Sequence, residues 1–178
     1  MFRPATLAFA VLVASSGSLS AQSPEPADWA ISSWDLPLLR PLPPGLDSAT
    51  LLDLEYERTD SIIGTAVDLN ADGTPDLLIE SARSLCGASG NCSFVIVDGR
   101  SRRSLGTIGG NRLFFRQRRI NAWPGVQTWW HMSAGSGLYS TYVFDGTQYV
   151  QLAAVSVEGD GLQSLFRQLD SVRTRSLR

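Results

Sequence analysis

The chain has 178 residues, a formal net charge of −2 and 43% hydrophobic residues. This size allows one domain with a substantial apolar core, so the fold does not need to depend on disulfides. Beyond the first residues, no apolar stretch is long enough for a membrane-spanning helix, which argues against an integral membrane protein.

The first 21 residues have the pattern of a secretory signal peptide. Arg3 supplies a positive charge, Leu7–Ala14 form a short apolar run, and small residues lead to a cleavage site near Ala21. We therefore expect a secreted or periplasmic protein. Residues 22–50 are rich in proline, and we interpret them as a leader with a short helix around Trp29–Leu39.

Short β-like segments alternate with turn residues from residue 51 onward, which predicts an all-β domain over residues 51–178. Apolar residues at helical spacing near its end predict a C-terminal helix. The expected strands are Leu51–Arg58, Ile62–Asp68, Asp76–Ala82, Ser93–Asp98, Leu113–Ile120, Gln127–Met132, Ser140–Asp145 and Tyr149–Val157, and the helix is Leu162–Val172.

Two segments of this domain repeat a similar pattern. Gly87–Gly99 and Ser133–Gly146 each contain a glycine-rich stretch, a strand of aromatic and β-branched residues, and an Asp-Gly pair typical of hairpin turns. Their spacing is about that of a four-stranded blade. We therefore expect two blade-like units, about 51–110 and about 111–160, whose short antiparallel strands form two sheets packed as a sandwich.

The most specific chemical pattern is D-L-N-A-D-G-T-P-D at residues 68–76, where acidic side chains would repel each other without a cation. Gly73 permits the positive φ of a tight turn. Oxygen ligands favour Ca²⁺, whereas Zn²⁺ prefers histidine or cysteine. The alternative is an Asx-rich turn that binds no metal. The predicted calcium ligands are the side chains of Asp68, Asn70, Asp72 and Asp76 and the carbonyl group of Thr74.

An EF-hand does not explain this loop, because Ile79 stands where that motif has its last glutamate and both flanks are strand-like. The stretch T-A-V-D-L-N-A-D-G-T-P-D-L-L-I instead resembles the loops of FG-GAP and VCBS-type repeats. These are the calcium-binding hairpins of integrin α-subunit propellers and of many bacterial exported proteins. The resemblance implies a loop between two antiparallel strands, in which Asp68, Asn70, Asp72 and Asp76 hold the ion.

Cys86 and Cys92 are the only cysteines. In an exported protein, a pair this close in sequence is expected to form a disulfide, which would stabilise the fold by about 2 kcal/mol. The alternative, a metal site built on the two cysteines, lacks a nearby histidine, because the only histidine is His131.

Charge is unevenly distributed along the chain. Residues 22–99 contain thirteen acids and three arginines, whereas residues 100–178 contain eleven arginines and four acids. We expect the two parts to attract each other within one fold, and the alternative is a basic surface for an anionic partner.

Two sets of residues that include aromatic side chains could contribute to binding or to packing. The arginines of Phe114–Arg119 either keep an edge strand soluble or contact an anionic polymer such as a glycan or a nucleic acid. Arg116–Arg119 is the basic part of this segment. Trp123, Trp129 and Trp130 form either part of the core or a platform on which a sugar stacks, and we expect at least one of them in the core.

No catalytic residue can be assigned, because His131 has no recognisable nucleophile motif to accompany it and no nucleotide-binding loop occurs. We expect a monomeric, exported calcium-binding module with a non-catalytic binding or structural role. Its partner would be a protein or a glycan, and nucleic acid is not expected. The alternatives are a secreted hydrolase that uses His131 with nearby carboxylates, and an inhibitor of a secreted enzyme.

Overall fold

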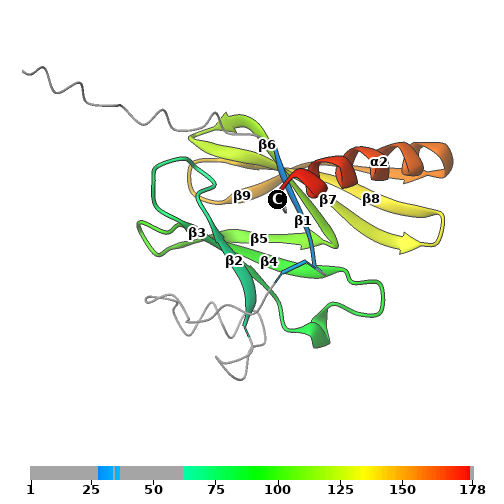
Figure 1. Ribbon diagram of the computed structural model, residues 1–178, viewed down its shortest axis with the longest axis horizontal. Coiled ribbons are helices and arrows are strands. Elements are labelled where there is room, and N and C mark those ends of the chain that lie inside the picture. The colour runs from blue at the N-terminus through cyan, green and yellow to red at the C-terminus, as the bar shows by residue number, and fades with distance from the viewer. Residues whose placement is uncertain (1–27, 34, 37–61, 177–178) are drawn as a thin grey trace, which may run out of the picture.

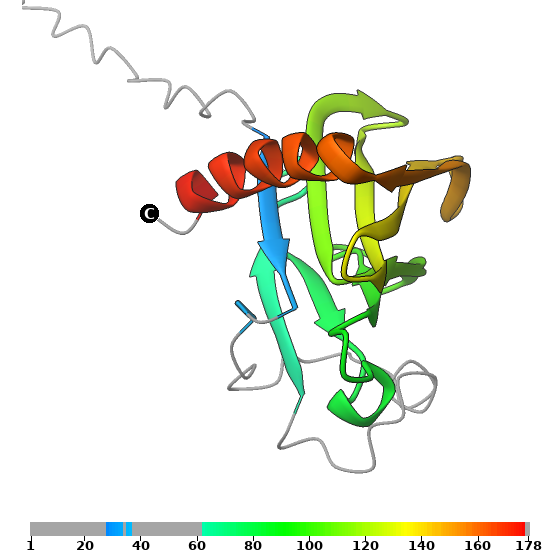
Figure 2. The ribbon, with the colours of Figure 1, turned by 90° about the vertical axis from the view of Figure 1, so that its right-hand side faces the viewer.

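The computed structural model describes residues 28–33, 35–36 and 62–176, without the side chains of residues 169 and 173–176. Two antiparallel sheets pack face to face, and one helix lies on the outer face of the larger sheet (Figures 1 and 2). The elements are β1 (Trp29–Ser32), β2 (Ile63–Val67), β3 (Asp76–Glu80), the 3₁₀ turn η2 (Arg83–Leu85), β4 (Cys92–Val97), β5 (Ser104–Gly110), β6 (Arg112–Ile120), β7 (Trp123–Ser133), β8 (Ser136–Phe144), β9 (Tyr149–Glu158) and α2 (Gly159–Ser176). The predicted all-β fold with a C-terminal helix is confirmed.

The two sheets follow the chain closely. The small sheet has the order β2-β3-β4-β5, and the large sheet has the order β1-β6-β7-β8-β9. All neighbouring strands are antiparallel, and the strands from β2 to β5 and from β6 to β9 each pair with the next strand in sequence. Each sheet is therefore a meander, and β1 is the one described strand whose sheet neighbour, β6, is not adjacent to it in sequence.

β1 corrects one expectation from the sequence. A short helix was predicted around Trp29–Leu39, but Trp29–Ser32 form a strand that pairs with residues 112–115 of β6. The reason is the alternation of side chains along the segment. Ile31 is buried in the core between the sheets and Trp29 packs against that core, whereas Ala30 is buried on the opposite face beneath α2.

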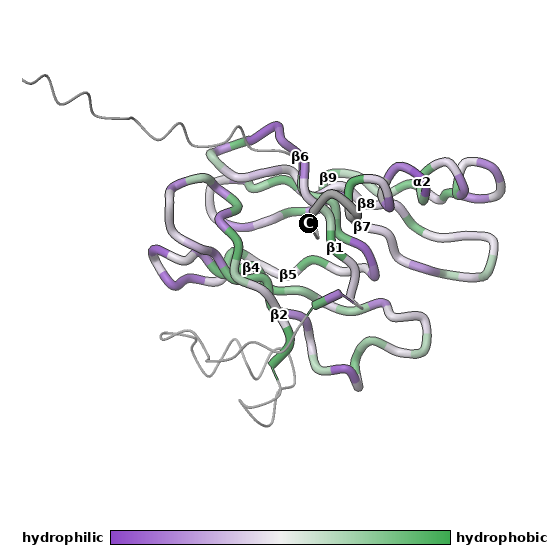
Figure 3. The backbone as a smooth tube through the Cα atoms, in the orientation of Figure 1, coloured by the Kyte–Doolittle hydropathy of each residue, from purple (hydrophilic) through white to green (hydrophobic). Residues whose placement is uncertain are grey.

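The main core lies between the two sheets. The small sheet contributes Leu78, Phe94 and Ile96, and the large sheet contributes Leu113 and Val126 among others. In Figure 3 the hydrophilic residues gather at loops, at strand ends and on part of α2, as expected for a sandwich whose strands bury their apolar side chains.

A second core fixes α2 on the large sheet. Leu162 and Val172 of the helix are buried against Phe114 and Trp129 of the sheet. The ring of Phe166 stands edge-on to Trp129, with 5.2 Å between centroids. The predicted amphipathic face is therefore the face that covers the sheet, apart from Leu169, whose side chain lies outside the described residues.

β5 was not expected from the sequence, because three of its seven residues are glycines. Two of them are required by close packing. A Cβ atom on Gly109 would lie 2.9 Å from the ring of Trp130, and one on Gly110 would lie 2.9 Å from the Trp129 carbonyl oxygen. The predicted strand Leu51–Arg58, the signal peptide and most of the leader lie outside the described residues. Of the part of the chain that the structure describes, no helix is long and apolar enough to cross a membrane.

Candidate functional site

The acidic segment forms the loop of a β-hairpin. β2 and β3 pair up to Val67 and Asp76, and residues 68–75 connect them. Gly73 has a φ of 86°, as the turn requires, and Ala71 also adopts a positive φ, of 58°. Because strands flank the loop on both sides, the local structure is not the helix–loop–helix of an EF-hand.

Side-chain oxygens of the loop accept hydrogen bonds from its own backbone. The two carboxylate oxygens of Asp68 accept from the amides of Asp72 and Gly73, at 3.1 and 2.9 Å. Asn70 Oδ1 also accepts from the Asp72 amide, at 2.9 Å, and Asp72 Oδ1 accepts from the Thr74 amide, at 2.8 Å. Each oxygen has a second lone pair, so these bonds shape the loop without using all of its acceptor capacity.

Asp76 has a different role from the other acids of the loop. Its side chain is fully buried, and its two oxygens accept from the amides of Leu69 and Gly99, both at 2.9 Å. Burial raises the pKa of Asp76, and the hydrogen bonds from Gly99 and Leu69 oppose that rise. Asp76 thus ties the β2–β3 loop to the turn between β4 and β5.

Pro75 and Gly99 bring those two turns into contact. A Cβ atom at position 99 would collide with the Pro75 carbonyl oxygen, so only glycine allows this approach. From the large sheet, Arg119 Nη2 donates to the Leu69 carbonyl at 3.1 Å. One arginine of the basic half of the chain therefore contacts the backbone of the acidic loop, and the attraction between the two halves stays a prediction.

The three carboxylates of the predicted site do not converge. Within the described residues, Asp68, Asp72 and Asp76 do not form a group whose ligand atoms all lie within 4.8 Å of one another. Asp76 faces the interior, whereas Asp68 and Asp72 are exposed. To share one ion, these side chains would have to turn towards each other, while the loop backbone already has its tight conformation.

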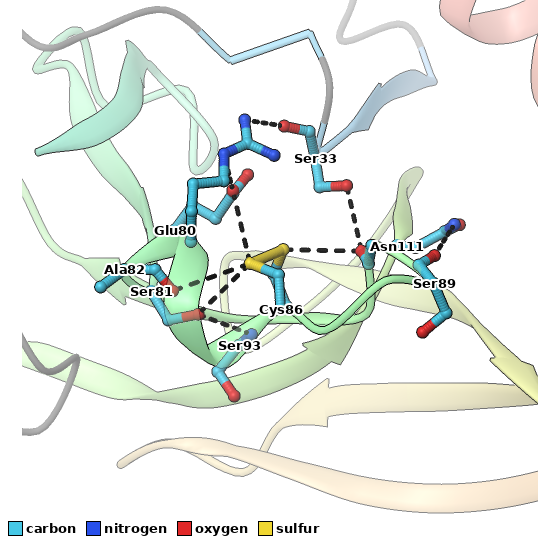
Figure 4. The surroundings of a disulfide bond; sticks show 11 residues. Ser33, Glu80, Ser81, Ala82, Cys86, Ser89, Ser93 and Asn111 are labelled. Atoms are coloured by element: carbon cyan, nitrogen blue, oxygen red, sulfur yellow. Dashed lines mark hydrogen bonds and ion pairs between the residues drawn. A yellow bond between two sulfur atoms is a disulfide. The ribbon is translucent and has the colours of Figure 1, made fainter.

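Cys86 and Cys92 are joined by a disulfide, as predicted, and both are buried (Figure 4). The sequence did not predict the fully buried Glu80 beside them. Its Oε1 lies 3.2 Å from Arg83 Nε and 3.7 Å from Cys86 Sγ. Burial raises the pKa of Glu80 to about 7, with Arg83 acting in the opposite direction. The opposite charges at positions 80 and 83 were the only signal of this pair in the sequence.

The disulfide loop connects several parts of the sandwich. Arg83 Nη2 donates to the Ser33 carbonyl at 2.7 Å, and Ser33 Oγ donates to the Gly90 carbonyl at 3.1 Å. Asn91 exchanges two hydrogen bonds with the backbone of His131 in β7, at 2.7 and 2.8 Å. Because both sulfurs are bonded to each other, they are not available as thiolate ligands, and the cluster with Glu80 is structural.

His131 has no catalytic environment in the described part of the chain. Both of its hydrogen bonds there are made by its backbone, and no described serine or carboxylate contacts its imidazole. The geometry gives no support to the hydrolase alternative.

The tryptophans separate into core and surface residues. Trp123 and Trp129 are buried, so the interpretation of all three as a sugar platform is wrong for these two. Trp130 is 40% exposed and lines a hollow of about 350 Å³ where the large sheet extends past β5. The other lining residues are Gly109, Met132, Leu138, Ser140, Tyr142 and Gln151.

The basic stretch of β6 is partly used within the fold. The guanidinium of Arg116 lies 4.8 Å from the centroid of the Phe114 ring, and Arg119 contacts the acidic loop. Arg118 is exposed.

Comparison with known proteins does not assign the chain to a family. It matches no protein-family model, and no match was found among curated proteins or solved structures. The function must therefore be argued from the hairpin loop and its surroundings.

Proposed function

We propose that the chain is an exported calcium-binding β module, secreted or periplasmic, with a non-catalytic binding or structural role. The observation that carries this proposal is the conformation of the 68–75 loop. Asp68, Asn70 and Asp72 are already arranged around the loop amides, with Gly73 at the turn, between two antiparallel strands. This hairpin setting agrees with the resemblance to FG-GAP and VCBS-type loops.

The donor set fits calcium chemically. Three carboxylates, one amide oxygen and the Thr74 carbonyl supply hard oxygen ligands, and water would complete the six to eight that Ca²⁺ takes. The buried disulfide and the signal-peptide pattern support export, where calcium is available at millimolar concentration and modules with weak sites function. We propose a protein or a glycan as the partner rather than nucleic acid.

Thermal unfolding with and without calcium tests the proposal. Binding to the folded state alone should raise the free energy of unfolding by about 2.7 kcal/mol when free Ca²⁺ is 100 times its dissociation constant. Even about 1 kcal/mol should raise the Tm by roughly 2–4 °C in a domain of this size. Millimolar Mg²⁺ should stabilise less, because it requires a tighter octahedral site.

Asp72→Asn and Asp145→Asn form a matched pair of variants for this experiment. Each aspartate is exposed and accepts backbone hydrogen bonds within a hairpin turn, but only Asp72 belongs to the proposed site. Asp72→Asn removes one negative charge from the site and should weaken the response to Ca²⁺, and Asp145→Asn should retain it. If the wild-type Tm does not respond to millimolar Ca²⁺ and calorimetric titration gives no heat, the loop is a metal-free turn and the proposal is wrong.

A further inference from the structure

The outer edge of β9 is an unusual surface for a strand at the end of a sheet. Among the described strands, none pairs with this edge. All six residues from 151 to 156 are exposed, including Leu152 at 67% and Val155 at 59%. No charged residue or proline occurs between Tyr149 and Val157. Edge strands usually carry such residues, because they prevent pairing with another chain.

The pairing of β9 with β8 shows which side chains share a face. Val155 lies opposite Tyr139, on the face that α2 covers, and Ala153 lies on that face too, opposite Thr141. Gln151 and Ser156 lie opposite Tyr142 and Leu138, which line the hollow. A bulge at Leu152 changes the alternation between these two groups.

Read in either direction from Ala154, β9 has a similar order of apolar and polar residues. With the bulge retained, antiparallel pairing of two copies puts Ala154 opposite Ala154, Val155 opposite Ala153, Ser156 opposite Gln151 and Val157 opposite Val150. Every pair combines side chains from the same face, apolar residues meet apolar residues, and the two polar residues meet each other. No like charges are opposed, since Glu158 falls opposite Tyr149.

We propose that β9 pairs antiparallel with β9 of a second copy, giving a two-fold symmetric dimer with one continuous sheet of ten described strands. Self-complementarity favours a second copy over an unrelated peptide, which would have no reason to match this order. Because Gln151 lines the hollow, pairing would also place the two hollows on the same face, on either side of the axis. The dimer departs from the monomer expected from the sequence, and it does not depend on the calcium proposal.

Charged substitutions of Ala154, which lies on the proposed two-fold axis, test both the dimer and its register. Ala154→Lys places two ammonium groups directly opposite each other, and Ala154→Glu does the same with two carboxylates, which opposes pairing. Sedimentation equilibrium of the full exported chain should show a wild-type dimer, and each variant alone should dissociate at least about tenfold more readily. An equimolar mixture of the two variants should form a dimer again, because lysine then faces glutamate.

Ser164→Lys adds the same charge on an exposed position of α2 and should leave the dimer unchanged. Circular dichroism and the wild-type Tm should be retained by all variants, because Ala154 is exposed. The proposal is overturned by a wild-type protein that stays monomeric at several hundred micromolar. It is equally overturned if Ala154→Lys leaves the dimer intact, or if the mixture of variants fails to restore it, because the contact then lies elsewhere.

Discussion

β3 and β9 are both antiparallel strands with apolar side chains, but they lie in opposite environments. β3 begins with Asp76 and ends with Glu80, and all five of its residues are buried. β9 follows Asp145 and ends with Glu158, and six consecutive residues in its middle are exposed. Neither strand has a charged residue other than the acids at its ends, which are Asp76 and Glu80 in β3 and Glu158 in β9. Their place in the sheets, one between two strands and the other at an edge, therefore decides what the same residue types contribute.

The acids of β3 and the acid in the turn before β9 show this difference most directly. Asp76 and Glu80 are fully buried, and each is compensated by specific partners, two backbone amides for Asp76 and Arg83 for Glu80. Asp145 remains in solvent and accepts from the amides of Thr147 and Gln148 with a single oxygen. Buried carboxylates depend on their partners far more than exposed ones do, because water cannot replace a lost hydrogen bond.

The largest expected difference between the two strands is the loss of stability when a leucine is replaced by alanine. Leu78→Ala in β3 should reduce the free energy of unfolding by about 2–5 kcal/mol, because the fully buried side chain would leave a cavity in the main core. Leu152→Ala in β9 should change it by less than about 0.5 kcal/mol in the monomer. Urea denaturation at low protein concentration measures both. Equal losses would show that β9 is buried in solution.

Glu80→Gln should remove a pH dependence of stability. The carboxyl group has a pKa of about 7 in the fold against a reference value of 4.5, so the folded protein holds this proton more tightly than the unfolded chain. The free energy of unfolding should therefore fall as pH rises from about 4.5 to about 7, by on the order of 3 kcal/mol in all. The glutamine variant stays neutral and should lack this decline.

Urea denaturation at intervals between pH 4.5 and pH 8 measures the profile, with Glu158→Gln at the exposed end of β9 as the matched control. The control should keep the wild-type slope, because its side chain is exposed. A Glu80→Gln profile as steep as the wild type would mean that other groups cause the pH dependence.

The smallest expected difference is the loss of stability when Asp76 or Asp145 is replaced by asparagine. Asp76→Asn replaces one acceptor by an NH₂ group that must face the amide of Leu69 or Gly99, which should cost about 2 kcal/mol. Asp145→Asn keeps the single oxygen that accepts both turn amides, and should cost less than about 0.5 kcal/mol. Denaturation in chelator separates this effect from calcium binding. Similar losses in the two variants would contradict the role assigned to Asp76.

The parts of the fold that the sequence predicted are those with local signals. β4 and β8 have aromatic and β-branched residues next to Asp-Gly turns, and the spacing of Cys86 and Cys92 predicted their disulfide. β1 and β5 have no such signal. β1 has only four residues and is defined by its pairing with β6, far along the chain. β5 contains glycines that disfavour a strand by themselves but are needed where Trp129 and Trp130 approach.

The candidate site also has features that local sequence predicts and features that depend on distant residues. The tight turn at Gly73 follows from the spacing of the aspartates, because local hydrogen bonds build it. The inward position of Asp76 could not be predicted, since it depends on the Gly99 amide, 23 residues away. Burial of Glu80 likewise results from how β3 packs beside the disulfide. Sequence spacing therefore identified which residues form the loop, but not which of them point into the protein.

The place of α2 in the sequence has a consequence for biosynthesis. Chains are made from the amino terminus, so α2 emerges after every strand that it covers. Until it does, Phe114 and Trp129 have no cover on their side of the large sheet. A nascent chain with its described strands already paired would still present an aromatic surface to the cell. A chaperone would be most useful during that interval, and translation halted just before Gly159 should yield an aggregating product.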